Sequence, residues 1–94
     1  MKIAVITGGS RGLGKSMAEH LAAQGNDVIF TYHTRKDEAD KVVASIEKHG
    51  RKAVALQLDI ANHTSFASFA GALKTALQQH WGREQFDYLI NNAG

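Results

Sequence analysis

The chain contains no cysteine and no proline. Without cysteine, a disulfide framework and a thiolate metal site are both excluded, and an intracellular, cytoplasmic location is the simpler interpretation. Long hydrophobic runs are missing as well, since none reaches the roughly 18 apolar residues that a membrane-spanning helix needs. The apolar run after Met1 and Lys2 is too short for the core of a signal peptide. The absence of proline excludes nothing by itself.

An excess of charge of one sign is also missing, because 11 Lys and Arg residues are balanced by 9 Asp and Glu residues, for a net charge of +2. The basic residues are scattered, with only short pairs such as Arg35-Lys36 and Arg51-Lys52. Nucleic-acid-binding proteins gather such residues on one face, so no nucleic-acid partner is expected. Hydrophobic residues make up 44% of the 94 positions and charged residues 21%, as in folded globular domains. The composition therefore predicts one small domain, or part of a larger one, with no membrane partner.

Short apolar runs alternate along the chain with segments of helical periodicity. The runs are typical of strands buried in a parallel sheet, and the predicted strands are residues 3–6, 28–32, 53–58 and 88–90. The periodic segments predict helices over residues 13–21, 39–46 and 66–81, closed by Gly25, Gly50 and Gly82. At the start of the second helix, Thr34 and Asp37 resemble a capping box in which aspartate replaces the usual Glu or Gln.

The predicted order of elements is β-α-β-α-β-α-β. A helix joins each pair of consecutive strands, so the strands should be parallel and the connections right-handed. This pattern predicts an α/β fold with a Rossmann-type parallel sheet of strand order 3-2-1-4, which is half of a doubly wound domain. Residues 1–94 would form the first half of such a domain. Ligands of such sheets bind beyond the carboxyl ends of the strands, where the strand order reverses.

A glycine-rich segment, VITGGSRGLGKSMAEHL (residues 5–21), joins the first predicted strand to the first predicted helix. Gly8 can adopt a positive φ at the sharp turn, Gly12 has no Cβ to obstruct a pyrophosphate, and Gly14 lets the helix lie close to the strand. The helix that begins near Leu13 offers unpaired N–H groups and the positive end of its dipole to an anion. A glycine-rich turn without a ligand is the alternative, but the β-α-β context favours phosphate binding.

Short motifs stand at the ends of the first, third and fourth predicted strands. Thr7–Gly14 reads TGGSRGLG, Leu58–Ile60 places the acidic residue Asp59 after the third strand, and Asn91–Gly94 reads NNAG. In this order and on these elements they resemble the T-G-x-x-x-G-x-G, acidic and N-N-A-G motifs of the short-chain dehydrogenase/reductase family. The resemblance extends over the whole chain and is nearest to the branch that contains 3-oxoacyl-[acyl-carrier-protein] reductases.

The resemblance implies a role for each matched position. The backbone at residues 10–13 would surround the pyrophosphate and the adenosine side of a nicotinamide dinucleotide. Asp59 would accept a hydrogen bond from the adenine amino group, Ile60 would line the adenine pocket, and residues 91–94 would shape the sheet end and contact the adenosine ribose. A lone aspartate at a strand end is more commonly solvated, and the alternative for Asp59 is therefore a solvated strand end. An Asn-Ala-Gly turn needs no ligand. The predicted cofactor-binding residues are Gly8, Ser10, Arg11, Gly12, Leu13, Gly14, Tyr32, His33, Thr34, Arg35, Asp59, Ile60, Asn91, Asn92, Ala93 and Gly94.

The end of the second strand indicates which cofactor is bound. NAD-binding enzymes place an acidic residue there, which bonds the ribose hydroxyls. Here the position is Tyr32, followed by His33, Thr34 and Arg35, and no carboxylate is present to repel a 2′-phosphate. Arg11, inside the glycine turn, and Arg35 can both bond a phosphate, although a solvated helix start is the alternative for Arg35. NADP(H) is therefore the predicted cofactor, with NAD(H) as the alternative.

The family's chemistry uses a serine together with a tyrosine and a lysine spaced Y-x-x-x-K on a helix. The tyrosine acts as general acid or base, and the lysine lowers its pKa. One such spacing runs from Tyr32 to Lys36, but it spans a strand-to-helix junction at the adenosine end and is not predicted to be catalytic. The family's own pair follows the N-N-A-G motif, so no catalytic residue is predicted in this chain. No metal site is predicted either, because no close pair at metal-ligand spacing occurs among His20, His33, His49, His63 and His80.

With the resemblance, the sequence predicts that residues 1–94 form the N-terminal dinucleotide-binding part of a single domain whose C-terminal catalytic part is absent. This would be the NADP(H)-binding part of a short-chain dehydrogenase/reductase, which transfers hydride reversibly between nicotinamide and a small carbonyl or alcohol substrate. The resemblance also implies a homo-oligomer for the full-length enzyme. Two other classes stay open: a non-catalytic dinucleotide-binding or interaction module, and an S-adenosylmethionine-dependent methyltransferase. Arg11 and the N-N-A-G segment argue against the methyltransferase, whose fold requires neither.

Overall fold

The computed structural model describes residues 2–8, 12–58 and 63–92, with the backbone alone at residues 63–66. Its elements are β1 (Ile3–Thr7), α1 (Gly12–Ala23), β2 (Asp27–Tyr32), α2 (Lys36–Lys48), β3 (Ala53–Gln57), α3 (His63–Trp81) and β4 (Tyr88–Asn91). Every predicted strand and helix is present, in the predicted order. None of the helices in these ranges has both the length and the apolar character that crossing a bilayer requires.

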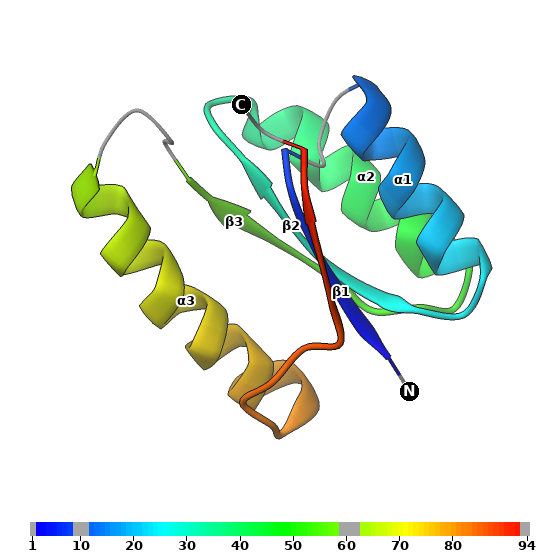
Figure 1. The fold of residues 1–94 in the computed structure, drawn as a ribbon. Helices are drawn as coiled ribbons and strands as arrows, with labels where there is room; N and C mark the ends of the chain where they lie inside the picture. The colour runs from blue at the N-terminus through cyan, green and yellow to red at the C-terminus, as the bar shows by residue number, and fades with distance from the viewer. Residues whose placement is uncertain (1, 9–11, 59–62, 93–94) are drawn as a thin grey trace.

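The strands form a parallel sheet in the order β3-β2-β1-β4, which confirms the predicted topology (Figure 1). β1 lies in the interior of the sheet, with Ile6 opposite Phe30 of β2 on one side and opposite Ile90 of β4 on the other. The chain leaves β1 toward β2 and β3 and returns on the other side of β1 as β4. The strand order therefore reverses between β1 and β4, which is where ligands bind in open α/β sheets.

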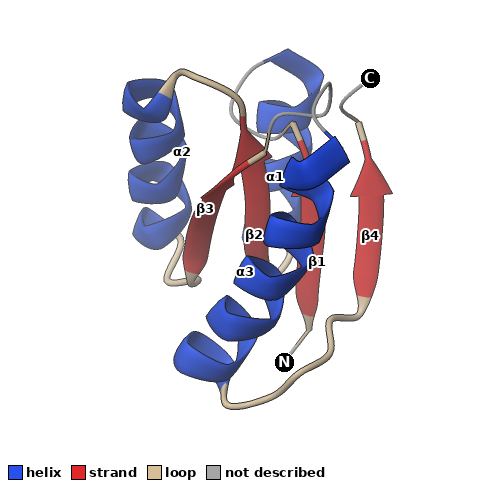
Figure 2. Cartoon of the chain, turned by 90° about the vertical axis from the view of Figure 1, so that its left-hand side faces the viewer, coloured by secondary structure: helices blue, strands red, loops and turns tan. Residues whose placement is uncertain are grey.

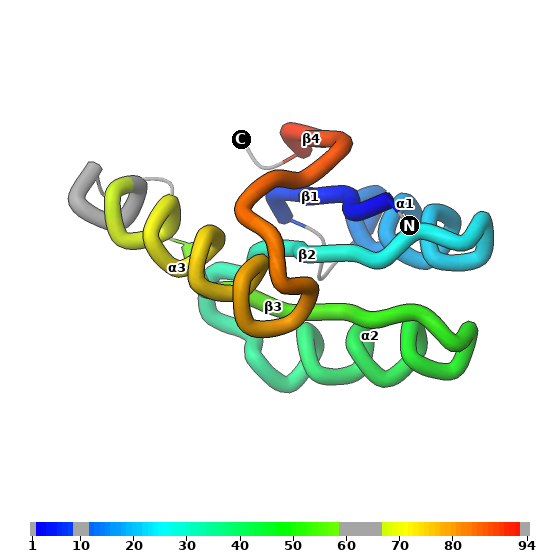
Figure 3. The backbone as a smooth tube through the Cα atoms, turned by 90° about the horizontal axis from the view of Figure 1, so that it is seen from below, coloured from blue at the N-terminus to red at the C-terminus, as the bar shows by residue number. Residues whose placement is uncertain are grey.

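The helices cover both faces of the sheet. α1 and α2 lie together on one side, and α3 lies on the opposite side (Figure 2, Figure 3). Side chains of β1 alternate between the two resulting cores: Ile6 belongs to the core under α1 and α2, whereas Ile3 and Val5 belong to the core under α3, around Leu77. Because both faces of β1 are buried, the strand needs an unbroken apolar run, and residues 3–6 supply it.

β4 is the least covered strand. In the described sheet it is an edge, with β1 as its neighbour on one side. Leu89 is 59% exposed and Tyr88 is 41% exposed. Leu89 lies opposite Val5, a member of the core under α3, so it extends the apolar face of that core past the cover of the helix. An exposed apolar edge strand is prone to pair with other chains.

The start of α2 differs from the prediction. The N-cap residue is Arg35, whose side chain makes no capping hydrogen bond, and the helix begins at Lys36. Thr34 contributes its carbonyl oxygen, which accepts a hydrogen bond from the N–H of Lys36 at 3.1 Å. The Asp37 carboxylate accepts hydrogen bonds from the guanidinium of Arg35. The predicted capping box of Thr34 and Asp37 is therefore wrong, because the helix starts one residue later and a charged partner holds Asp37.

Candidate functional site

The connection from β1 to α1 contains glycines in the left-handed backbone region. Gly8 directly follows β1 with a φ of 76°, and Gly12 opens α1 with a φ of 57°. Residues with a Cβ rarely adopt such angles, so the predicted positive φ at Gly8 is confirmed. A Cβ added to Gly12 would meet no described atom within 4 Å, so the space beside the helix start is open. This opening agrees with a turn that leaves room for an anion.

Gly14 is the position where the helix touches the sheet. A Cβ on Gly14 would lie 2.0 Å from the carbonyl oxygen of Gly8 and 2.6 Å from Nδ2 of Asn92. The nearer of these atoms belongs to the backbone, so no side-chain rotation could relieve the clash. The prediction that Gly14 lets the helix lie close to the first strand is confirmed, and the contact includes Asn92, the residue after β4.

Two asparagines at the end of β4, Asn91 and Asn92, tie that strand to β1 and to the glycine turn. Thr7 donates from Oγ1 to Oδ1 of Asn91 at 2.9 Å, and the same hydroxyl accepts a hydrogen bond from the backbone N–H of Asn92 at 3.0 Å. The side-chain amide of Asn92 donates to the carbonyl oxygen of Gly8 at 3.3 Å. The first half of the N-N-A-G motif therefore shapes the sheet end, as the resemblance implied.

Thr31 fixes the same turn from β2, and the sequence analysis did not select it. Its hydroxyl oxygen accepts a hydrogen bond from the N–H of Gly8 at 2.8 Å, and the residue is only 2% exposed. A buried hydroxyl requires a partner, so a threonine next to the last position of an otherwise apolar strand was the available signal. Gly8 is thus held through its N–H by Thr31 of β2 and through its carbonyl by Asn92 after β4.

The start of α1 lies at the carboxyl end of the sheet, beside this turn (Figure 2). The first N–H groups of a helix have no partner within the helix, and the helix dipole places partial positive charge there. The first turn of α1, residues 12–15, all of them described, contains no acidic residue. Leu13, in that turn, is 70% exposed. No carboxylate of α1 itself therefore competes with an anion for the helix start.

The end of β2 forms the neighbouring part of the site. Tyr32 is half-buried and packs against the core under α1 and α2. Its carbonyl oxygen accepts a hydrogen bond from the N–H of Leu58 at 2.9 Å, and Nε2 of Gln57 donates to the carbonyl oxygen of His33 at 3.1 Å. His33, Thr34 and Arg35 are exposed. The ends of β2 and β3 are thus held together, and no carboxylate stands at the end of β2.

Arg35 does not extend alone into solvent. Its Nε and Nη2 donate to the two carboxylate oxygens of Asp37 at 3.2 and 3.1 Å, and Nη2 lies 3.7 Å from Oε1 of Glu38. The hydrogen bond from Arg35 lowers the pKa of the Asp37 carboxyl below its ordinary value of 3.8. Lys36, the second half of the Y-x-x-x-K spacing, pairs through Nζ with Oδ2 of Asp40 at 3.3 Å. The lysine thus binds a carboxylate of its own helix.

The described part of the site consists of Gly8, Gly12, Leu13, Gly14, Asn91 and Asn92 around the turn, and Tyr32, His33, Thr34 and Arg35 at the end of β2. The other predicted residues lie outside the described residues: Ser10, Arg11, Asp59, Ile60, Ala93 and Gly94. Within the described ranges, no group of His, Cys, Asp and Glu side chains is arranged to hold a metal ion.

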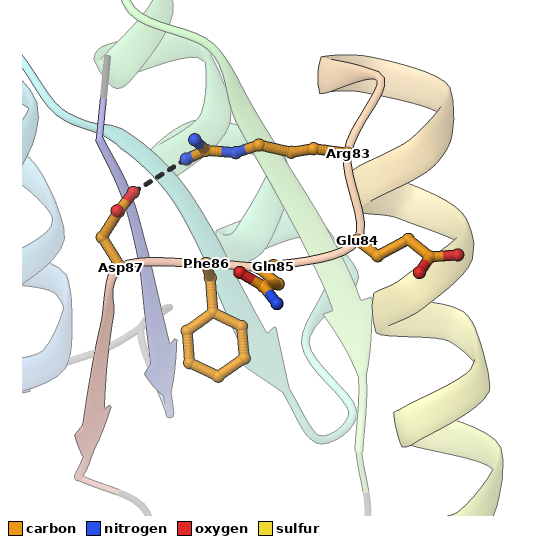
Figure 4. A pocket seen from close by; sticks show the side chains of 5 residues that line it. All are labelled: Arg83, Glu84, Gln85, Phe86 and Asp87. Atoms are coloured by element: carbon orange, nitrogen blue, oxygen red, sulfur yellow. Dashed lines mark hydrogen bonds and ion pairs between the residues drawn. The ribbon is translucent and has the colours of Figure 1, made fainter.

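Two carboxylates that accept hydrogen bonds, those of Asp27 and Asp87, lie at the opposite, amino end of the sheet. Asp27, 2% exposed, accepts hydrogen bonds from the N–H of Lys52 at 2.8 Å and from Nε1 of Trp81 at 2.6 Å. Asp87 accepts hydrogen bonds from the N–H of Ile3 at 2.8 Å and from Arg83 at 2.7 Å (Figure 4). The Ile3 hydrogen bond, aided by Arg83, lowers the pKa of Asp87 below its ordinary 3.8. The first set of contacts attaches α3 to β2, and the second attaches the loop before β4 to β1, both far from the turn.

The loop before β4 also forms a pocket of about 330 Å³, lined by residues 83–87 (Figure 4). In Figure 4 the Arg83 guanidinium reaches Asp87 across the loop, and the Phe86 ring points away from this pair. The pocket lies at the amino end of β4, so it is separate from the glycine turn.

A parallel sheet whose order reverses beside a glycine turn and a helix start defines the class of the protein. It is a Rossmann-type α/β fold, built on the pattern of dinucleotide-binding domains. The chain belongs to the short chain dehydrogenase family, whose family model matches residues 2–94. The resemblance found in the sequence motifs is therefore confirmed.

Individual relatives support the same assignment. The chain is 39% identical over 93 residues to a 3-oxoacyl-[acyl-carrier-protein] reductase from Synechocystis sp., covering 99% of this chain and 35% of the reductase. It is 33% identical over 93 residues to glucose 1-dehydrogenase 2 of Bacillus subtilis, covering 99% and 34%. Among solved structures, the angucycline C-6 ketoreductase LanV with bound NADP has a TM-score of 0.94 at 35% identity, covering 99% of this chain and 36% of LanV. The chain thus spans about a third of the length of these relatives.

Proposed function

We propose that the chain is the NADP(H)-binding part of a short-chain dehydrogenase/reductase that transfers hydride reversibly between nicotinamide and a carbonyl or alcohol substrate. The observation that carries the proposal is the glycine turn. Gly8 is held by Thr31 on one side and by Asn92 on the other, next to a helix start without acidic residues. The helix start beside a turn held in this way offers its unpaired N–H groups to an anion.

The residues present fit an adenosine dinucleotide. The pyrophosphate would bind the N–H groups at the start of α1, where no Cβ fills the space beside Gly12. Arg11 and Arg35 would bond the 2′-phosphate, and Tyr32 replaces the carboxylate that favours NAD(H). LanV, at 35% identity, holds NADP, which supports this choice. Adenine and its ribose would be held by Asp59, Ile60, Asn91, Asn92, Ala93 and Gly94. When bound, the nicotinamide ring supplies the hydride chemistry.

The catalytic groups are not assigned to this chain. Tyr32 packs into the core under α1 and α2, and Lys36 pairs with Asp40 at 3.3 Å, so the Y-x-x-x-K spacing at the end of β2 serves the fold. In this proposal the serine, tyrosine and lysine that the resemblance implies act together with the substrate pocket in another part of the protein. The protein would work in the cytoplasm, as a homo-oligomer when full length.

A thermal-shift titration of the 94-residue chain with NADPH, NADH and S-adenosylmethionine, side by side, tests the proposal. We expect NADPH to raise the unfolding temperature most, because ligand binding stabilises by about 2.7 kcal/mol at a hundredfold excess over Kd. NADH should raise it less, and S-adenosylmethionine should leave it unchanged. A chain that responds to neither dinucleotide would contradict the proposed function, and a response to S-adenosylmethionine alone would support the methyltransferase class instead.

A further inference from the structure

The Arg35 side chain is already bound by carboxylates of its own helix. Its Nε and Nη2 form a two-pronged pair with Asp37 at 3.2 and 3.1 Å, and Glu38 lies 3.7 Å from Nη2. We call these three side chains the Arg35 cluster. It contains one positive and two negative charges, so it is net negative at the place where 2′-phosphate recognition needs positive charge.

The geometry of the pair explains why Asp37 is a direct competitor for this arginine. An arginine binds a carboxylate and a phosphate through the same arrangement of two parallel N–H groups. The Nε–Nη2 edge of Arg35 is therefore occupied by Asp37 in the way that a phosphate would occupy it. A phosphate that approaches this edge has to displace Asp37, or share the guanidinium with Asp37 at the cost of repulsion between two anions.

We propose that Asp37 is a specificity-determining residue that acts through Arg35, by competing with the 2′-phosphate of the cofactor for the guanidinium. The inference rests on the proposed function, because it requires an NADP(H) site at the end of β2. In this arrangement Arg35 contributes only part of the phosphate recognition of which it is capable. The preference for NADP(H) over NAD(H) is correspondingly weaker than the two arginines alone would give.

The exposure of the pair sets the size of the effect. The side chains of Arg35 and Asp37 are 52% and 61% exposed, so solvent screens their attraction. Exposed ion pairs of this kind shift a competing equilibrium by about two- to fivefold. Replacing Asp37 by asparagine should therefore raise the affinity for a 2′-phosphate by about two- to fivefold. The affinity for a nucleotide without that phosphate should stay the same.

The test compares two nucleotides that differ only in the 2′-phosphate, adenosine 2′,5′-bisphosphate and adenosine 5′-monophosphate. Isothermal titration of the 94-residue chain gives the ratio of their dissociation constants for the wild type and for Asp37→Asn. Taking this ratio removes any general effect of the substitution on folding or on the start of α2. Asp40→Asn is the matched control, because Asp40 is equally exposed at 61%, lies on the same helix and pairs with Lys36 instead of Arg35.

Repeating Asp37→Asn in an Arg35→Ala background separates competition from simple charge removal. If Asp37 acts through the guanidinium, the gain of about two- to fivefold disappears when Arg35 is absent. If Asp37 acts only as a nearby negative charge, the gain remains.

The outcomes distinguish this inference from the proposed function. A wild type that binds neither nucleotide, or that shows no preference for the bisphosphate, overturns the proposed NADP(H) site and the inference with it. A wild type that prefers the bisphosphate, with Asp37→Asn no different from Asp40→Asn or equally effective without Arg35, overturns the inference alone. An increased preference that depends on Arg35 supports both.

Discussion

Gly14→Ala should be among the most damaging single substitutions in this chain, although it adds only a methyl group. The new Cβ would lie 2.0 Å from the Gly8 carbonyl oxygen and 2.6 Å from Asn92 Nδ2, whereas atoms of these kinds pack no closer than about 3 Å. α1 would have to move away from β1 by about 1 Å, and the hydrogen bond between Asn92 and Gly8 would break. Overpacking in a core costs about 1–3 kcal/mol. We expect a loss at or above the upper end of that range, because the obstructing atom belongs to the backbone.

Gly71→Ala is the control, because it adds the same methyl group to a glycine in a different environment. Gly71 lies in α3, and a Cβ there would meet no described atom within 4 Å. Alanine should stabilise that helix by about 0.5–1 kcal/mol. Urea denaturation followed by circular dichroism gives the free energy of unfolding of both variants. In a thermal melt, each kcal/mol should shift the unfolding temperature by about 4–8 °C in a domain of this size. If Gly14→Ala unfolded at the wild-type urea concentration, the close packing of α1 on the turn would be refuted.

The other predictions concern single groups described above. Thr31→Val removes the acceptor of the part-buried Gly8 N–H and should lower the free energy of unfolding, measured by urea denaturation, by about 1–3 kcal/mol, with Thr31→Ser close to wild type. Because the pKa of Asp87 is lowered below 3.8 in the folded state, its stabilising contribution is full above that value and is lost as the pH falls through the folded pKa. Urea midpoints measured across the acid range should therefore fall more steeply for wild type than for Asp87→Asn, and parallel curves would contradict this. Tyr32→Asp should move cofactor preference toward NAD(H), and Arg11→Ala should weaken NADPH binding by about ten- to a hundred-and-fifty-fold while affecting NADH far less. Equal weakening of both cofactors would assign Arg11 to the pyrophosphate or to the fold. The isolated chain should self-associate through the β4 edge, and Leu89→Lys should shift its sedimentation toward monomer; a monodisperse wild-type monomer would count against this.

Features that depend on nearby residues could be predicted from the sequence. The alternation of strands and helices follows from local patterns of apolar residues, and the sheet order then follows from the handedness of the crossovers. The glycine turn was equally accessible, because the need for a positive φ at Gly8 and for close packing at Gly14 is local to the β1–α1 junction.

Features that depend on which of several possible hydrogen-bond or ion-pair partners a side chain contacts could not be predicted. Asp37 is suited both to a helix cap and to an ion pair, and only the position of the Arg35 guanidinium decides between them. Thr31 is equally suited to a strand interior, and its role depends on the distance from its hydroxyl to the N–H of Gly8. The hydrogen bond from Trp81 to Asp27 joins residues 54 positions apart, and no local sequence pattern reveals such a contact.

The hydrogen bonds that join the end of β1 and the turn after it to the asparagines at the end of β4 also have a consequence for the order of folding. Thr7 and Asn91 are 84 positions apart, so the turn is synthesised well before the groups that lock it. Closing a loop of that length costs roughly 4 kcal/mol of chain entropy, and contacts between distant segments form slowly. A nascent chain that lacks β4 already contains the glycines but not the clamp on the Gly8 carbonyl. The Gly8 carbonyl is therefore clamped only when the fourth strand docks, and a change that undocks this strand acts on Gly8 from 84 positions away.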